Sequence, residues 1–146
     1  MPIAQQIPIP VPKRTVFTKT GLGDLGAISE AIAAEVSIPH GPIKLLNGVE
    51  GATGGFGREH IESHVSRMKQ LQGMGYSDVV SYVYYVASAF TYVAQQEDGR
   101  IIIVREDGSL YHQVICQWDE DLNVWSVTTA IPKNNIRKLK IVWRAS

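Results

Sequence analysis

The pattern of apolar and polar positions divides the chain into a helical first half and a second half with the two-residue period of β-strands. In the first half, apolar residues recur at intervals of three and four, which predicts helices over residues 24–36, 58–72 and 77–94. A short strand is expected at residues 42–47. From residue 100 onward the period changes to two, which predicts strands over residues 100–105, 110–118, 124–131 and 139–143.

The connections between these elements indicate the fold class. Asp107-Gly108 is a hairpin turn signal, and consecutive strands joined by such short turns pair antiparallel. Helices followed by a run of strands are typical of α+β proteins. We therefore expect N-terminal helices packed on a four- to five-stranded antiparallel β-sheet. The helix that begins near Ser77 is so apolar that it is expected to be buried under the sheet.

Proline content suggests how the chain is divided. Pro2, Pro8, Pro10 and Pro12 disfavour helix and central strand, so residues 1–41 are interpreted as a proline-rich arm or linker that carries one short helix. Residues 42–146 are expected to form the folded domain. The first residues lack the basic and apolar regions of a signal peptide, and no stretch has the length of a membrane-spanning helix.

Charge is balanced over the whole chain but not along it. The formal net charge is zero, so the overall composition does not favour nucleic-acid binding. Residues 132–146, however, contain five basic residues and no acidic one. Such a local basic strip can bind phosphates even in a neutral protein. The single cysteine, Cys116, excludes an intramolecular disulfide.

Two histidines are the main candidates for chemistry. His60 and His64 are four residues apart on the predicted middle helix, so their side chains share one face, and Arg67 continues the same line. Three interpretations are open. The histidines are exposed without a chemical role, or they bind a metal, or they act as a general acid and base beside cations that stabilise an anionic transition state.

The sequence around these histidines gives little support to the metal interpretation. The order His60-Ile-Glu-Ser-His64 is not the His-Glu-x-x-His pattern of zinc proteases, and there is no cluster of cysteine and histidine ligands. The preceding glycine-rich segment, residues 51–57, fits neither a Walker A loop nor a dinucleotide fingerprint and is interpreted as a flexible lead-in to the helix.

His112 lies on the same face of its predicted strand as apolar residues, which predicts a structural histidine facing the core.

Six segments between residues 42 and 143 occur in an order that is itself informative. They are Pro42-Ile-Lys-Leu-Leu-Asn-Gly48, Gly55-Phe-Gly-Arg-Glu-His-Ile-Glu-Ser-His64, Gly75-Tyr-Ser-Asp-Val-Val80, Gly99-Arg-Ile-Ile-Ile-Val104, Trp125-Ser-Val-Thr-Thr-Ala-Ile-Pro132 and Lys138-Leu-Lys-Ile-Val-Trp143. This ordered set resembles nuclease domains of phage-encoded proteins and of bacterial polymorphic toxins. These belong to the superfamily named for barnase, EndoU, colicins E5 and D, and RelE.

The resemblance implies a ribonuclease fold that uses no metal or other cofactor, with RNA on the face of the sheet opposite the helices. It implies catalytic roles for His60 and His64, which match the paired histidines of the family, and for Thr129, which matches a strand threonine. The expected reaction is an internal transesterification, in which one histidine takes the proton of a ribose 2′-hydroxyl group.

The same resemblance implies substrate-binding roles for basic residues. Lys44 matches a basic position in the first strand, and Arg58 and Lys138 match two others. Together with Arg67, which lies in line with the histidines, these residues are expected to bind RNA phosphates and stabilise the phosphorane.

Membership in this superfamily also implies partners and a place of action. The expected function is that of an antibacterial toxin, of the contact-dependent growth inhibition type, with tRNA as the substrate. A cognate immunity protein is the implied partner, and a translation elongation factor is a further possible one. The domain would be delivered as the C-terminal part of a larger protein and act in the bacterial cytoplasm, without inserting into the membrane. The alternatives are a non-catalytic binding or adaptor module and a metal-dependent nuclease using His60 and His64.

Overall fold

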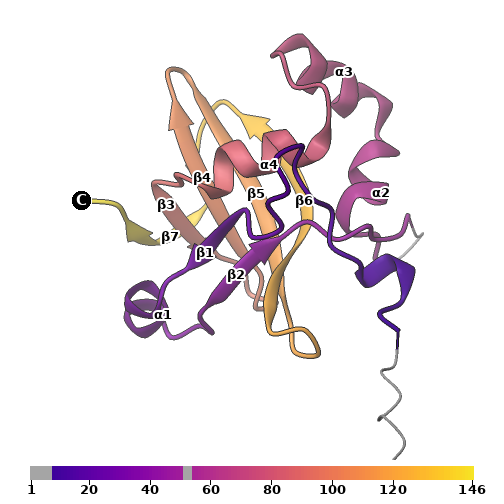
Figure 1. Cartoon of the computed structure of the whole chain (residues 1–146). Helices are drawn as coiled ribbons and strands as arrows, with labels where there is room; N and C mark the ends of the chain where they lie inside the picture. The colour runs from indigo at the N-terminus through magenta and orange to yellow at the C-terminus, as the bar shows by residue number, and fades with distance from the viewer. Residues whose placement is uncertain (1–7, 51–53) are drawn as a thin grey trace, which may run out of the picture.

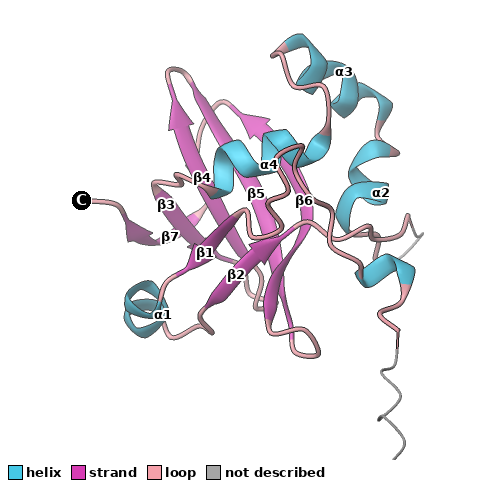
Figure 2. Cartoon of the chain, in the orientation of Figure 1, coloured by secondary structure: helices cyan, strands magenta, loops and turns pink. Residues whose placement is uncertain are grey.

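The computed structural model describes residues 8–50 and 54–146, and it confirms the predicted α+β class (Figures 1 and 2). The helices of these segments are η1 (Val11–Lys13, a 3-10 helix), α1 (Glu30–Val36), α2 (Gly57–Glu62), α3 (Val65–Gly73) and α4 (Val79–Ala87). The strands are β1 (Gly26–Ile28), β2 (Gly41–Lys44), β3 (Tyr92–Gln95), β4 (Ile101–Asp107), β5 (Leu110–Asp119), β6 (Val124–Lys133) and β7 (Lys140–Arg144).

All described strands belong to one sheet, in the order β1-β2-β6-β5-β4-β3-β7. Every neighbouring pair is antiparallel except β2 and β6, which are parallel. The prediction of a four- to five-stranded antiparallel sheet is therefore wrong in strand number and in one pairing. The parallel pair escaped prediction because β2 and β6 lie far apart in the chain, and no local turn signal encodes such a pairing.

The helix predicted to end near residue 94 ends instead at Ala87, and the chain continues as β3. Val93 and Ala94 are both fully buried, but they belong to apolar clusters on opposite faces of the sheet. A central strand satisfies both residues, because successive side chains point to opposite faces. The last apolar residues of the run 79–94 thus match the helical period only by coincidence, because they belong to β3.

The sheet buries its two faces unequally. α4 crosses one face (Figure 1), and its Val79, Val83 and Val86 are fully buried in the main core, as predicted for this helix. The opposite face carries a smaller cluster of Ala94, Ile102 and Val104, which the segment between β6 and β7 covers with partly buried apolar residues.

The N-terminal segment is built into the same sheet and core. The helix predicted to begin at residue 24 begins at Glu30. The Ser29 hydroxyl group caps it, because it accepts a hydrogen bond from the Ile32 amide. β1 precedes it and pairs with β2, so strands on both sides of the predicted boundary at residue 41 share one sheet. Part of the predicted arm, residues 1–7, lies outside the described residues. Among the helices of the described segments, none is long and apolar enough to cross a bilayer.

Candidate active site beside strand β6

The predicted helix over residues 58–72 is two helices, and the break places the histidines differently from the prediction. α2 ends at Glu62, and His64 adopts an extended conformation as the residue that precedes α3. His60 and His64 are therefore not on one continuous helix. They nevertheless lie together, with their ring centroids 5.0 Å apart and the ring planes at 88°.

Backbone hydrogen bonds and a close backbone contact fix the chain that leads into α2. Val49 and Phe56 exchange two hydrogen bonds of 3.0 Å, which closes the loop between β2 and α2. Gly48 precedes this pair with a φ of 74°, and a Cβ atom there would lie 1.7 Å from the Phe56 carbonyl oxygen, so only glycine fits. Residues 51–53 of the glycine-rich segment lie outside the described residues.

The start of α2 is anchored to the chain that leaves β2. The Arg58 amide donates to the Leu46 carbonyl at 2.9 Å, and the Glu59 amide donates to the Asn47 carbonyl at 2.8 Å. These bonds satisfy amides that a helix leaves free at its N-terminus. Ile61 is fully buried in the main core and fixes the rotation of the helix. His60, the preceding residue, is thereby held at the edge of the core.

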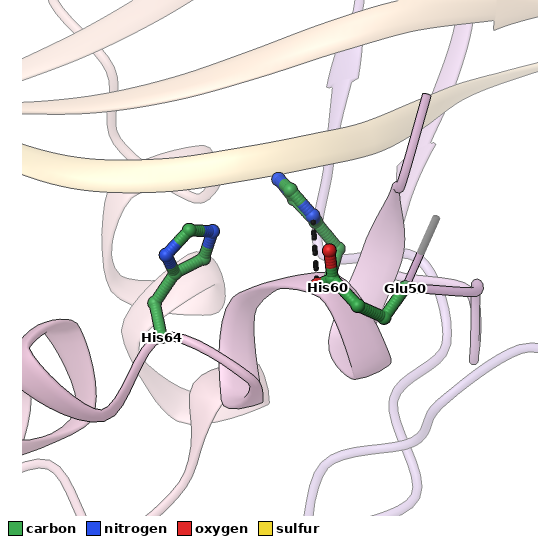
Figure 3. Close-up of side chains that lie close together, drawn as sticks. All are labelled: Glu50, His60 and His64. Carbon is green, nitrogen blue, oxygen red and sulfur yellow. Dashed lines mark hydrogen bonds and ion pairs between the residues drawn. The ribbon is translucent and has the colours of Figure 1, made fainter. Parts of the chain in front are cut away.

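Glu50 lies against the His60 ring (Figure 3), and Ser63 completes a polar cluster around them. The Nδ1 atom of His60 lies 3.2 Å from a carboxylate oxygen of Glu50. The Ser63 hydroxyl group donates to the same carboxylate oxygen and lies 2.7 Å from the His60 carbonyl. A carboxylate at Nδ1 favours the tautomer with its proton on that atom, which leaves Nε2 free to accept a proton.

Both imidazole rings extend toward β6, against which α2 packs (Figure 3). The His60 side chain is 23% exposed and His64 is exposed, so solvent and ligands can reach the pair. Beyond Lys44 and its partner Ser126, β2 no longer pairs with β6. α2 occupies the place beside β6 that another strand would otherwise take, which brings a helix-borne pair of histidines to a sheet edge.

Gly55 sets the position of the His60 ring. A Cβ atom on Gly55 would lie 2.5 Å from His60 Nδ1 and 3.0 Å from the Val49 carbonyl oxygen. Gly55 also lies on the rim of an open cavity of about 340 Å³, together with Ser126 and Thr128 of β6. The cavity and the histidine cluster are therefore neighbours.

The charge of Glu50 is stabilised within the cluster. The hydrogen bond from Ser63 lowers the pKa of the Glu50 carboxyl group, and the nearby His60 lowers it further. A carboxylate that stays ionised attracts cations, whether a protonated imidazole or a metal ion. Glu50, His60 and His64 each offer a ligand atom, and these three atoms lie within 4.8 Å of one another.

Thr129 and Arg67 lie on the β6 side of the site. Thr129 is half-buried on β6, and a bulge in the pairing with β5 lies next to it. Arg67 of α3 donates to the carbonyl group of the next residue, Ala130, at 2.6 Å. Its burial lowers the pKa of the guanidinium group. Arg67 thus ties α3 to β6 one residue from the predicted threonine.

The other three predicted substrate-binding residues lie in three separate environments. Lys44 forms an ion pair with Asp24 at 3.2 Å, and Arg58 donates to the Asn47 side chain at 2.7 Å. Lys138 is exposed in the segment between β6 and β7, beside the end of β3. Since β3 is three strands away from β6, Lys138 is not brought together with the histidines.

Sequence reasoning did not identify Glu50 or Ser63 as members of the site. Ser63 lies between the two histidines, so its proximity was a detectable signal. Glu50 is ten positions before His60, and only the closed loop between β2 and α2 brings it to the imidazole. A lone acidic residue before a glycine-rich segment carries no local signal of that contact.

The third histidine on a structured element has the predicted structural role. His112 lies on β5 with its side chain 4% exposed, and its Nδ1 atom is 2.8 Å from the Tyr82 hydroxyl oxygen. Burial lowers the pKa of this imidazole.

Comparisons of the chain with protein-family models, with curated proteins and with solved structures return no match.

Proposed function

We propose that the chain is an antibacterial endoribonuclease toxin that cleaves RNA, with tRNA as the substrate, by metal-independent acid–base transesterification. The observation that carries the proposal is the contact of His60 with the Glu50 carboxylate, with His64 at a ring distance of 5.0 Å. A carboxylate that orients one imidazole, next to a second and reachable imidazole, is an arrangement suited to paired proton transfer.

In this mechanism His60 acts as the base. Its Nε2 atom takes the proton of a ribose 2′-hydroxyl group, and the 2′-oxygen forms a bond to the adjacent phosphorus. The bond from phosphorus to the 5′-oxygen breaks, and protonated His64 gives its proton to that oxygen. The products are a 2′,3′-cyclic phosphate and a free 5′-hydroxyl group. Glu50 keeps the His60 ring oriented and stabilises its positive charge once the proton has been taken.

The cavity beside His60 offers a place for one nucleotide of the substrate. Its volume of about 340 Å³ lies within the range of small-molecule sites. Ser126 and Thr128 supply hydroxyl groups, and the rim carries both acidic residues (Asp119, Glu120 and Asp121) and basic ones (Lys13 and Arg100). Lys13 is paired with Asp119, so the rim has no basic excess, and we assign the cavity to a base or ribose, which can exchange hydrogen bonds with hydroxyl groups and carboxylates.

The RNA backbone is assigned to cations elsewhere. Arg67 is hydrogen-bonded to the Ala130 carbonyl group, one residue from Thr129, and Thr129 can donate a hydrogen bond to a phosphate oxygen. The exposed basic strip that begins at Lys133, the last residue of β6, continues the positive charge along the sheet. Lys44, Arg58 and Lys138 remain candidates for phosphate binding, the first two after exchanging their present partners.

The biological setting follows from the same proposal. A toxin of this type would reach the bacterial cytoplasm as the C-terminal part of a larger protein of a ribonuclease-toxin superfamily. The producing cell would need an immunity protein, and a covered Glu50–His60–His64 site is the simplest way for that protein to inhibit cleavage. A translation elongation factor is a candidate activator.

The test is cleavage of bacterial tRNA by the purified chain in the presence of EDTA, with and without added elongation factor. We expect discrete fragments that end in a 2′,3′-cyclic phosphate. His60→Ala and His64→Ala should each lower the rate by about 10²- to 10⁴-fold, which is the usual contribution of a general acid or base. His40→Ala is the matched control, because His40 is exposed in a loop.

Each contrary result has its own meaning. Intact RNA with folded protein and elongation factor present would contradict the proposal and favour the binding-module alternative. Cleavage that EDTA abolishes and a divalent metal restores would favour the metal-dependent alternative. Cleavage without a cyclic phosphate would exclude internal transesterification.

A further inference from the structure

We propose that Glu50, His60 and His64 also form a binding site for one divalent transition-metal ion of the Zn²⁺ class, and that the bound ion inhibits the acid–base site. The first half stands on the geometry of the three residues alone. The second half rests on the proposed ribonuclease function. Metal binding would make the site responsive to the ion content of the compartment in which the protein is found.

The distances among the three side chains are close to those of a metal site. Zinc binds histidine nitrogens and carboxylate oxygens at about 2.0–2.2 Å, so two ligands of a tetrahedral site lie roughly 3.3–3.5 Å apart. His60 Nδ1 and the Glu50 oxygen are already 3.2 Å apart. The three ligand atoms are all within 4.8 Å of one another, so the exposed His64 side chain has to move toward the other two to close the site.

The donor set favours transition metals over magnesium or calcium. Two imidazoles and one carboxylate are the protein ligands of many catalytic zinc sites, where the fourth position is left to water or substrate. Mg²⁺ and Ca²⁺ prefer six or more oxygen ligands, and this cluster offers the oxygens of a single carboxylate. Glu50 and His64 are exposed, so an ion can enter from solvent without unfolding the site.

Neighbouring groups support the ligands in the same way as in known metal centres. Ser63 donates a hydrogen bond to the Glu50 carboxylate, and Gly55 lies directly beside the His60 ring and leaves room for it. Hydrogen bonds to ligating carboxylates orient them and increase metal affinity. Glu50 directly follows Val49, which closes the loop with Phe56, and His60 lies in α2, which begins directly after Phe56, so the site is partly preorganised before an ion binds.

The bound ion would stop proton transfer because it changes which nitrogen of His60 carries the proton. A metal at His60 Nδ1 replaces the proton there, and the neutral ring then carries its remaining proton on Nε2. Nε2 becomes a donor and can no longer accept the proton of a 2′-hydroxyl group. His64, bound through one nitrogen to the same ion, is likewise withdrawn from its role as acid.

The metal site is tested by titrating the purified chain with Zn²⁺, Co²⁺ and Mg²⁺, using calorimetry and the visible absorption of Co²⁺. We expect one equivalent of Zn²⁺ or Co²⁺ to bind, with the intense absorption of a tetrahedral cobalt site, and no binding of Mg²⁺ at the same concentrations. Glu50→Gln and His64→Ala should weaken Zn²⁺ binding by at least about tenfold, since the loss even of supporting groups costs 10- to 100-fold.

His40→Ala should leave the affinity unchanged, and circular dichroism of each variant controls for folding. If Zn²⁺ binds no more tightly to the original chain than to the Glu50→Gln and His64→Ala variants, the metal site is excluded. That result leaves the ribonuclease proposal untouched.

The inhibitory role is tested by adding Zn²⁺ to the tRNA cleavage reaction. Inhibition that is complete near one equivalent and is reversed by EDTA supports it. Zn²⁺ binding at the three residues without any effect on cleavage overturns it, and so does cleavage that appears only with Zn²⁺. If Zn²⁺ binds but no cleavage occurs under any condition, the ribonuclease function has failed and the metal site stands.

Discussion

Two histidine clusters in the same fold, one buried and one exposed, show what decides the use of an imidazole. His112 is held inside the domain by β5 and α4, bonded to Tyr82 and edge-on to the Tyr82 and Tyr85 rings. His60 lies beside β6 on a short helix, hydrogen-bonded to the half-exposed Glu50 carboxylate, with His64 as its neighbour.

The difference lies in the partners and not in the residue type. Burial strongly raises the pKa of the Tyr82 phenol, so this partner of His112 stays neutral. The Asp107 carboxylate lies 4.0 Å from His112 Nε2, but burial outweighs it and lowers the pKa of the imidazole. The pKa of Glu50 is lowered and the carboxylate keeps its charge, so it attracts cations such as metal ions. A buried neutral partner makes a histidine structural, whereas an ionised and exposed partner makes it available to ligands.

The largest expected effect is on stability, at His112. His112→Ala removes a buried ring and leaves the Tyr82 hydroxyl group without its partner, which should cost about 2–4 kcal/mol. For a chain of this length the melting temperature should fall by roughly 5–15 °C. Thermal unfolding followed by circular dichroism measures the change.

The matched substitution in the other cluster is His64→Ala. Because His64 is exposed, its loss should change the free energy of unfolding by no more than about 0.5 kcal/mol while lowering the rate of RNA cleavage by about 10²- to 10⁴-fold. Equal stability losses at the two positions would erase the distinction between the clusters.

The next effect is steric and is confined to the exposed cluster. Gly55→Ala places a methyl group 2.5 Å from His60 Nδ1, so the ring must move away from Glu50. Overpacking of this kind costs about 1–3 kcal/mol, and both cleavage and Zn²⁺ affinity should fall with it. Gly73→Ala is the control, since a Cβ atom there meets nothing within 4 Å. Unchanged cleavage and Zn²⁺ affinity in the Gly55→Ala variant would show that the Glu50–His60 contact is dispensable.

The buried cluster should also impose a pH dependence on stability. His112 faces Arg105 and Asp107 of β4 and Tyr82 and Tyr85 of α4, and burial lowers its pKa below the ordinary 6.5. Below that pH the unfolded chain binds a proton that the folded chain does not, so stability falls as the pH falls through this window and levels off below the folded pKa.

This contribution is measured as a difference between two proteins. Urea unfolding of the original chain and of His112→Gln, from pH 7.5 to pH 5, should show a steeper loss for the original chain below pH 6.5. Parallel curves would show that His112 titrates alike in both states.

The sequence predicted the parts of this molecule whose patterns are local. The period of two in residues 100–143 located β4, β5, β6 and β7, and the apolar face of α4 indicated its burial. β1 was missed because three residues are too few to show a period. β3 was assigned to a helix because its apolar residues fit both periods. The parallel pairing of β2 with β6 depends on packing between distant segments, which no local pattern records.

The candidate site shows the same limit at the level of side chains. The proximity of His60 and His64 was predictable from their spacing, although the helix breaks between them. The carboxylate that orients His60 was not, since Glu50 reaches it through a loop closed by the backbone bonds of Val49 and Phe56. Tertiary contacts of this kind decide which nitrogen of an imidazole is free, and therefore what the residue can do.

The smallest expected effect tests whether Ser63 contributes to the exposed site by holding the Glu50 carboxylate in place. Ser63→Ala removes the hydrogen bond to Glu50, so the pKa of that carboxyl group should rise toward its ordinary value. Stability should change by less than about 0.5 kcal/mol because the residue is exposed, whereas Zn²⁺ affinity should fall by about tenfold, as is usual for the loss of a group that supports a ligand.

Ser66→Ala is the control, because Ser66 is exposed on the next turn and its hydroxyl group makes no hydrogen bond within the described part of the chain. If the two serine variants bind Zn²⁺ equally well, Glu50 is held by His60 alone. If only Ser63→Ala is weakened, the short segment from His60 to His64 both supplies the two imidazoles and positions their carboxylate. The cluster is then one preorganised unit, set apart from the buried histidine by its ionised partner.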